Sequence, residues 1–269
     1  MNNQKVELLS PAGNLEKLKI AIKYGADAVY AGVSHFSLRI RAGKEFTFET
    51  FKEGIDYAHA RGKRVYATIN GFPFNSQIDL LKKHILTMAE LGPDAFIVAA
   101  PGVVRLCREL APQIPIHLST QANVLNYMDA QVFWDMGVKR IVVAREISLK
   151  DVKEIKKHLP DMEIEIFAHG SMCFAYSGRC LVSAVQMGRV PNRGSCANDC
   201  RFEYTLYAVN EDHGTLFRLE EEPGVGTYIF NSKDLNLASH IQEILDSGAV
   251  NALKIEGRTK SPYYAAVTA

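Results

Sequence analysis

The sequence of 269 residues lacks long apolar runs and carries almost no net charge. No segment reaches the roughly 18 uncharged apolar residues that a membrane-spanning helix needs, and the amino-terminal stretch MNNQKVELLSPAG contains no apolar core of signal-peptide length. The formal net charge of +1 provides none of the basic excess that nucleic-acid-binding domains often carry. We therefore expect a cytoplasmic protein with no membrane partner, in which any contact with RNA comes from a local patch.

Several catalytic and nucleotide-binding signatures are also missing. The chain has no HExxH pair of zinc ligands and no GxSxG nucleophile elbow, which disfavours the common zinc-dependent and serine-dependent hydrolases. It has no GxGxxG turn after a predicted strand and no P-loop, so the usual dinucleotide and nucleoside-triphosphate motifs are excluded. A hydrolase would need a nucleophile or a metal-bound water, and no motif outside the cysteines supplies one.

Cysteine is the residue type whose placement is most informative. Four of the five cysteines fall within the segment HGSMCFAYSGRCLVSAVQMGRVPNRGSCANDCR, at Cys173, Cys180, Cys196 and Cys200. A chain of this length and 47% hydrophobic content buries a core without disulfides. Grouped thiols in a cytosolic protein are more often metal ligands or redox groups than disulfide partners. We interpret this segment as the functional centre.

The spacing of the four thiols leaves three interpretations open. Six residues separate the first pair, fifteen the second and three the third, so the CxxC pairs typical of zinc sites are absent and zinc is the weaker alternative. An all-cysteine iron-sulfur cluster tolerates varied spacing when the loops converge, although the radical-SAM pattern CxxxCxxC is not present. A catalytic thiol paired with His169 is the third interpretation, and it leaves three cysteines unexplained.

One phrase recurs along the chain: a helix-like stretch, a glycine and a short apolar strand. The glycines are Gly25, Gly62, Gly92, Gly137 and Gly248, and glycine after a helix favours the left-handed conformation that ends it. Candidate strands cover residues 6–9, 28–30, 64–70, 95–98, 116–120, 140–143, 163–168 and 252–256. Eight strands alternating with amphipathic helices predict an α/β protein, a (β/α)8 TIM-type barrel, rather than an open doubly wound sheet.

The organisation predicts a single TIM-type barrel domain over residues 1–269. Between predicted strands seven and eight, residues 170–240 contain no clear helix unit and carry the four-cysteine segment, so we expect a functional insertion there. Residues 261–269 resemble the opening turns of an eighth helix, and we expect a further C-terminal portion beyond Ala269.

Polar residues at the carboxyl ends of the predicted strands are candidates for the active site, because barrel enzymes place their chemistry there. We predict binding of a small metabolite by residues near these ends and catalytic roles for others. Alternation along the strands places Glu165 on one face of its strand and Lys254 with Glu256 on one face of theirs. If these faces point into the barrel, pairing of Lys254 with Glu165 or Glu256 would offset the cost of burial, and a purely structural ion pair is the alternative. The predicted catalytic residues are Glu165, His169, Lys254 and Glu256, and the predicted substrate-binding residues are Asn70, Gln121, Arg145 and Arg258.

The cysteine segment also holds the only local basic patch that we identify as an RNA-binding candidate. Its arginines are Arg179, Arg189, Arg193 and Arg201, and the aromatic residues Phe174, Tyr176 and Phe202 are near enough in sequence to stack on a splayed base. The alternative is a structured, solvated loop whose arginines bridge carboxylates.

The stretch EIFAHGSMCFAYSGRCLVS, residues 165–183, resembles the signature of peptidase family U32, the collagenase-like peptidases. The signature positions are filled by Glu165, Phe167, Gly170, Ser171, Met172, Cys173, Gly178, Cys180 and Ser183. The resemblance extends through LLSPAGN, GADAVYAG, STQANV, VVAREIS, NRGSCANDCR, NSKDL and LKIEGR, which together span nearly the whole chain.

This resemblance implies an activity and a cofactor. Some members are called collagenases or peptidases, whereas others resemble RNA hydroxylation proteins that form 5-hydroxyuridine at the tRNA wobble position with prephenate as a required metabolite. In those relatives cysteines of this region hold a 4Fe-4S cluster, which maps onto Cys173, Cys180 and Cys196, with Cys200 as the fourth ligand. Some relatives have a cysteine where this chain has Asn236. We expect a tRNA-modifying hydroxylase with tRNA as partner. The alternatives are a peptidase acting on a protein or peptide, and an iron-sulfur accessory or scaffold protein.

Overall fold

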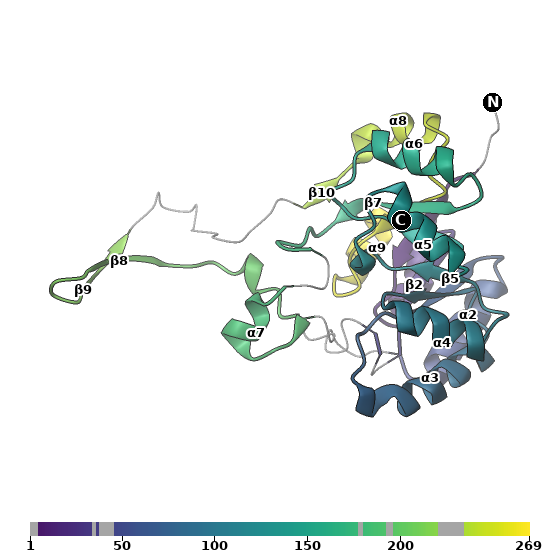
Figure 1. Ribbon diagram of the computed structural model, residues 1–269, viewed down its shortest axis with the longest axis horizontal. Helices are drawn as coiled ribbons and strands as arrows, with labels where there is room; N and C mark the ends of the chain where they lie inside the picture. Colours follow the sequence, from purple (N-terminus) through teal and green to yellow (C-terminus); the bar gives the residue numbers. More distant parts are fainter. Residues whose placement is uncertain (1–4, 34–35, 38–45, 177–179, 192–195, 220–233) are drawn as a thin grey trace.

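Eight parallel strands close into a barrel in the computed structural model, which describes residues 5–33, 36–37, 46–176, 180–191, 196–219 and 234–269 (Figure 1). The neighbour order is β7-β11-β1-β2-β3-β4-β5-β6, and pairing of β6 with β7 completes the circle. The predicted TIM-type barrel is therefore confirmed. Its strands are β1 (Glu7–Pro11), β2 (Ala28–Ala31), β3 (Arg64–Ile69), β4 (Ala95–Val98), β5 (Ile116–Leu118), β6 (Arg140–Val142), β7 (Glu163–Gly170) and β11 (Ala252–Ile255).

Helices cover the outside of the barrel, one after most strands (Figure 1). They are α1 (Leu15–Tyr24), α2 (Phe48–His59), α3 (Ile78–Glu90), α4 (Pro101–Leu110), α5 (Tyr127–Asp135), α6 (Leu149–His158), α8 (Ile241–Asp246) and α9 (Pro262–Thr268). Side chains of Asn14, Asn126 and Ser148 cap the first turns of α1, α5 and α6 by accepting a backbone N–H. The five glycines predicted to end helices all have positive φ. Within the described residues, no helix is long and apolar enough to cross a membrane.

The core has two unequal parts. The larger part lies between the strands and the surrounding helices and contains residues such as Leu18, Phe51 and Ile85, all fully buried. The smaller part lies inside the barrel and consists of Leu9, Ala28, Tyr30, Tyr66, Ala95 and Ile97. Because the apolar residues inside the barrel are few, polar and charged side chains fill the rest of its interior.

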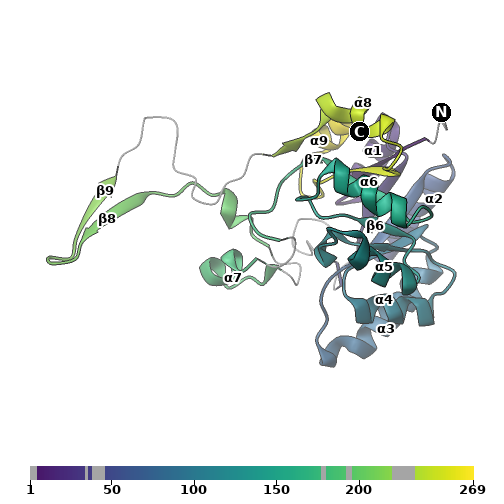
Figure 2. The same cartoon turned by 45° about the horizontal axis from the view of Figure 1, so that its top comes forward.

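The insertion, residues 170–240, extends from the barrel rim between β7 and β11, as predicted. It includes α7 (Val182–Met187), a 3-10 turn η4 (Asp199–Arg201) and a hairpin of β8 (Leu206–Asn210) and β9 (Thr215–Leu219). In both views the hairpin projects away from the barrel and α7 lies nearer to it (Figures 1 and 2). The short β10 (Leu235–Asn236) then pairs antiparallel with the end of β7. The insertion therefore begins and ends beside one strand.

Candidate functional site

A cavity lies at the carboxyl ends of the barrel strands, between the barrel and the insertion. Its floor and walls come from Tyr30 on β2, Thr68 and Asn70 at the end of β3, Ile97 on β4, Ser119, Thr120 and Gln121 after β5, Val142 and Arg145 from β6 and the turn after it, Phe167 on β7, and Lys254, Glu256 and Arg258 from β11 and the loop after it. Its roof comes from Cys173, Tyr176, Cys180, Pro191 and Cys196. The cavity therefore combines barrel side chains with three of the four clustered cysteines.

Three cationic side chains reach the cavity from the barrel, held against aromatic rings. The Lys254 ammonium lies 4.3 Å from the centre of the Tyr30 ring, and the Arg145 guanidinium stacks at 3.8 Å on Phe167. Arg258 Nη1 donates to Thr68 Oγ1 at 3.2 Å. Glu256 is the acidic lining residue, with its Oε2 3.6 Å from Arg145 Nη2. The described lining thus holds three cations and one carboxylate, and one of the cations, Lys254, is also paired with Glu165 beneath the cavity.

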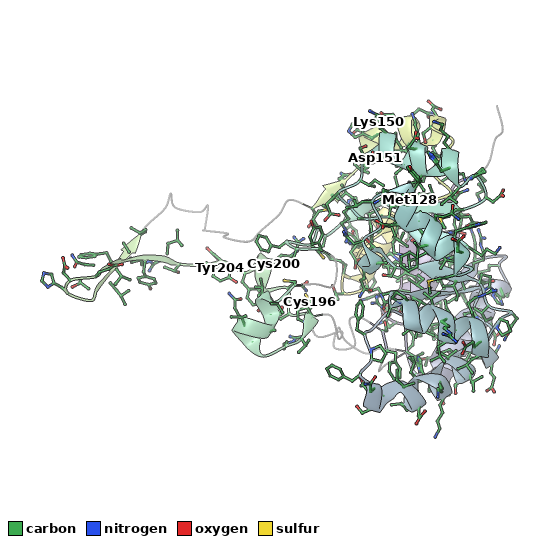
Figure 3. All side chains as sticks on the ribbon, in the orientation of Figure 1. Met128, Lys150, Asp151, Cys196, Cys200 and Tyr204 are labelled. Atoms are coloured by element: carbon green, nitrogen blue, oxygen red, sulfur yellow. The ribbon has the colours of Figure 1, made fainter. Side chains whose placement is uncertain are left out.

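The four cysteines Cys173, Cys180, Cys196 and Cys200, named here the thiol cluster, are free thiols. Burial raises the pKa of Cys200, and the nearby Cys196, Cys173 and Cys180 raise it further against the opposing effect of Arg201. Cys200 thus stands within electrostatic range of all three cysteines that line the cavity. Figure 3 shows Cys196 and Cys200 in the part of the insertion nearest the barrel. Among the described residues, no three His, Cys, Asp or Glu side chains are arranged to hold a single metal ion.

Asp199, next to Cys200, carries a deeply buried carboxylate. Its side chain is 1% exposed, and within the part of the chain that the structure describes neither carboxylate oxygen has a hydrogen-bond partner. Burying a carboxylate is costly unless it is compensated.

A chain of buried ions runs through the barrel beneath the cavity. Arg140 Nη1 donates to Glu7 Oε1 at 2.6 Å and to Glu165 Oε2 at 3.3 Å, and Lys254 Nζ donates to Glu165 Oε1 at 2.7 Å. Burial disfavours the charge of Arg140, but Glu165 and Glu7 outweigh it and raise the pKa of the guanidinium. Lys254 is therefore anchored from below by Glu165, as alternation along the strands predicted.

His117 lies inside the same charged region and is expected to make stability depend on pH. Burial, together with Arg140, Lys254 and Arg64, lowers the pKa of its imidazole well below the usual value. A group with a lowered folded-state pKa stabilises the fold above its unfolded pKa and loses that contribution as the pH falls. Wild type should lose about 2 kcal/mol relative to His117→Phe between about pH 7.5 and pH 5. Urea unfolding at several pH values measures this difference, and parallel curves for the two proteins would contradict it.

Two of the four predicted catalytic residues, Lys254 and Glu256, line the cavity, and two do not. Glu165 is fully buried beneath Lys254. His169 hydrogen-bonds through Nδ1 to Tyr264 Oη at 2.9 Å. Because Tyr264 donates its hydroxyl hydrogen to the Glu256 carbonyl oxygen, the network assigns the Nδ1 proton to His169 as donor. Its described hydrogen-bond partner is therefore a phenol rather than a thiol.

All four predicted substrate-binding residues line the cavity. Gln121 is held rigidly, because its amide donates to the Asn70 carbonyl oxygen at 3.1 Å and accepts from Ser119 Oγ at 3.0 Å. Arg145 and Arg258 present guanidinium groups after β6 and β11, the two strands that flank β7 in the barrel. Their substrate-binding role stays a prediction.

The described arginines of the predicted RNA patch make contacts within the insertion. Arg189 donates to the Cys196 carbonyl oxygen at 3.4 Å, and Arg201 donates to the Met172 carbonyl oxygen at 2.7 Å. Arg179 and Arg193 lie outside the described residues. Phe174 and Tyr176 are about half exposed, and Tyr176 also lines the cavity. The aromatic side chains are thus better placed for contact with a base than Arg201 is.

Sequence reasoning missed three residues of this site. Arg140 was assigned only to a strand, although an arginine inside an apolar run is itself a signal of a buried acidic partner. Tyr30 and Tyr264 were not singled out, and no local pattern distinguishes the ring that carries Lys254 or the phenol that meets His169. These contacts depend on barrel closure, which joins distant parts of the chain.

Comparisons with known proteins assign the family. The family model described as peptidase family U32 matches residues 13–269. The chain belongs to peptidase family U32. It is 75% identical over 264 residues to tRNA hydroxylation protein P of Helicobacter pylori strain J99, a match that covers 98% of this chain and 63% of the relative. Escherichia coli K12 has a tRNA hydroxylation protein P that is 43% identical, with 98% of this chain and 66% of the relative covered. The chain thus spans somewhat under two thirds of these relatives.

The fold agrees with a solved U32 structure. The U32 peptidase Mk0906 superposes with a TM-score of 0.59 at 14% identity, covering 96% of this chain and 95% of that one. At such low identity the likeness supports the barrel fold alone.

The U32 signature glycine at position 170 has a clear structural reason. Gly170 ends β7 with a φ of +117°, and a Cβ placed there would lie 2.3 Å from the Glu256 carbonyl oxygen. Only glycine combines this backbone conformation with such a close approach. The residue therefore lets the thiol-bearing segment leave β7 directly against the strand that carries Lys254.

Proposed function

We propose that this chain hydroxylates RNA, forming 5-hydroxyuridine at the tRNA wobble position. The names of the two tRNA hydroxylation relatives support the substrate and the reaction. The observation that carries the proposal is the cavity itself, in which cysteines face an excess of buried cations across one space. A tRNA substrate also supports a cytoplasmic location.

A 4Fe-4S cluster is the cofactor that we propose for the thiol cluster. In such a cluster each cysteine binds a different iron, so the sulfurs lie farther apart than the ligands of one ion. Cys200 lies within electrostatic range of the three thiols that line the cavity, and the spacing of the four, without a CxxC pair, fits a cluster better than zinc. When bound, the cluster would supply electron transfer at the cavity.

Cys200 is the fourth ligand that we propose beside Cys173, Cys180 and Cys196. Asn236, the other position considered, is exposed, and its Oδ1 accepts the Ala238 N–H at 3.0 Å. An amide is a poor iron ligand beside a free thiol. We therefore prefer Cys200 as the fourth ligand, although it is the one cysteine of the thiol cluster that does not line the cavity.

The metabolite that we propose is a dicarboxylate, with prephenate as the candidate from the family. Arg145 and Arg258 supply two guanidinium groups, each able to take one carboxylate. They would hold the molecule from the two strand ends that flank β7, above Lys254, which is itself paired with Glu165. The aromatic faces of Tyr30 and Phe167 exclude water from the same space. Glu256, beside Arg145, is placed to accept a proton from the bound molecule.

Removal of one cavity arginine is expected to weaken binding of the dicarboxylate. Arg145→Gln should raise the dissociation constant for prephenate by about tenfold or more, because a charge-assisted contact is lost in a buried site. Isothermal titration calorimetry measures this effect. Arg105→Gln, at an exposed arginine on α4, is the matched control and should leave the constant unchanged. Equal affinities of wild type and Arg145→Gln would remove the anion-binding role.

The decisive test of the function combines cofactor analysis with tRNA chemistry. The protein is purified without oxygen, its iron and sulfide are quantified, and tRNA from cells lacking the gene is analysed by mass spectrometry. We expect a coloured iron-sulfur protein and loss of hydroxyuridine from the tRNA. Unchanged tRNA with altered proteolysis would favour a peptidase, and an iron-free active protein would overturn the cofactor.

A further inference from the structure

Arg201 links three separate parts of the chain at the base of the insertion. It follows Cys200 directly in η4, and its Nη2 donates to the Met172 carbonyl oxygen at 2.7 Å. Its Nη1 lies 2.8 Å from Asp234 Oδ1. One side chain, 24% exposed, thereby contacts the residue before Cys173 and the residue before β10.

The partners of Arg201 are themselves fixed to the barrel. Met172 lies two residues beyond the end of β7. Asp234 precedes β10, which pairs with His169 and Gly170 of β7, and its second oxygen lies 4.0 Å from Lys260 Nζ in the loop after β11. The guanidinium therefore connects the Cys200 end of the thiol cluster to the barrel rim at two points.

We propose that Arg201 is a positioning residue for the thiol cluster, holding Cys200 at a fixed distance from Cys173. A planar guanidinium suits this role because two of its donors point to two different acceptors at once, which a lysine ammonium does not reproduce with the same geometry. The proposal rests on the proposed cofactor site and reassigns Arg201 from contact with RNA. The Arg201–Asp234 ion pair brings these two residues together at the barrel rim, although 33 positions separate them in the sequence.

The experiment compares Arg201→Ala, Arg201→Lys and Asp234→Asn with wild type in three measurements. A bifunctional bimane reagent cross-links neighbouring thiols in the reduced, iron-free protein, and mass spectrometry locates each cross-link. Iron and sulfide are counted after anaerobic reconstitution, and binding of tRNA is titrated. Arg218→Ala is the matched control, because it removes the same charge from the exposed hairpin far from the thiols.

Arg201→Ala and Asp234→Asn are both expected to lower the yield of the Cys173–Cys200 cross-link and the lifetime of the reconstituted cluster by about tenfold, the effect of losing one charge-assisted hydrogen bond. Arg201→Lys should give a cross-link yield and a cluster lifetime between those of these two variants and those of wild type. Asp234→Asn removes a negative charge, so it should not weaken tRNA binding. Should Arg201→Ala fail to fold, Asp234→Asn carries the test alone.

A different set of results would contradict the positioning role of Arg201. If Arg201→Ala keeps the cross-link and the cluster but weakens tRNA binding, while Asp234→Asn changes neither thiol measurement, Arg201 is an RNA contact and the proposal fails. A wild-type protein that binds no iron would overturn the proposed cofactor. The cross-linking comparison would still decide the role of Arg201 in that case.

Discussion

Cys196→Ser is expected to remove the cluster and with it the hydroxylation of tRNA. Serine keeps the size of the side chain but replaces a thiolate ligand by a hydroxyl that binds iron weakly. Iron per chain should fall from about four to well below that value after anaerobic reconstitution, because one iron loses its thiolate ligand and the cluster is destabilised. Hydroxyuridine in tRNA should fall to background when the variant replaces the wild-type gene.

The remaining cysteine provides the control. Cys107 lies in α4 with 1% of its surface exposed, and burial raises the pKa of its thiol to about 12. Cys107→Ala should therefore keep both iron and hydroxylation, at a modest cost in stability. Retention of full iron content by Cys196→Ser would show that the thiol cluster does not hold the cofactor.

Arg140→Met is expected to produce the largest loss of stability of any substitution considered. It leaves Glu7 and Glu165, which are 4% and 0% exposed, without their shared partner. Removing one member of a buried ionic group costs about 3–5 kcal/mol, because both carboxylates stay buried with one cation fewer, Glu165 keeping only Lys254 and Glu7 only Arg64. Urea unfolding followed by circular dichroism measures the difference in the free energy of unfolding.

An exposed arginine provides the control, because its substitution removes the same charge from the surface instead of from the barrel interior. Arg105 pairs with Glu109 on the surface of α4, where both side chains are more than half exposed. Arg105→Met should cost less than about 1 kcal/mol, since surface ion pairs contribute little. The double variant Arg140→Met, Glu165→Gln should recover part of the lost stability. Equal effects of Arg140→Met and Arg105→Met would contradict the importance of the buried chain of ions.

The strands of the fold could be predicted because their signals are local. Each of the eight predicted strands overlaps an observed one, since β-branched runs follow the glycines that end the helices. Alternation along β7 and β11 predicted a partner for Lys254 in Glu165 or Glu256, and the structure pairs it with Glu165, their charged atoms 2.7 Å apart. The alternation of side chains along the strands and the glycines that end the helices were enough to predict these features.

The contacts that complete the site could not be predicted, because they join positions far apart in sequence. Arg140 meets Glu7 across 133 positions, a contact that exists only once β6 and β1 share a closed barrel. His169 is directed to Tyr264 on α9 by the packing of that helix. The sequence identified the arginines of the insertion as a charge pattern, but only the fold reveals that Arg201 contacts a carbonyl and a carboxylate of its own chain.

The antiparallel β10 has a consequence for how this architecture can diversify. The insertion leaves the end of β7, and β10 then pairs with His169 and Gly170 of that same strand. This part of β7 lies beyond Glu165, the last residue that pairs with β6. Residues between the end of β7 and β10 can thus be exchanged, added or removed while all eight parallel strands keep their neighbours. The same barrel can therefore carry different insertions, and each insertion would determine which molecule reaches the cavity at the carboxyl ends of the strands.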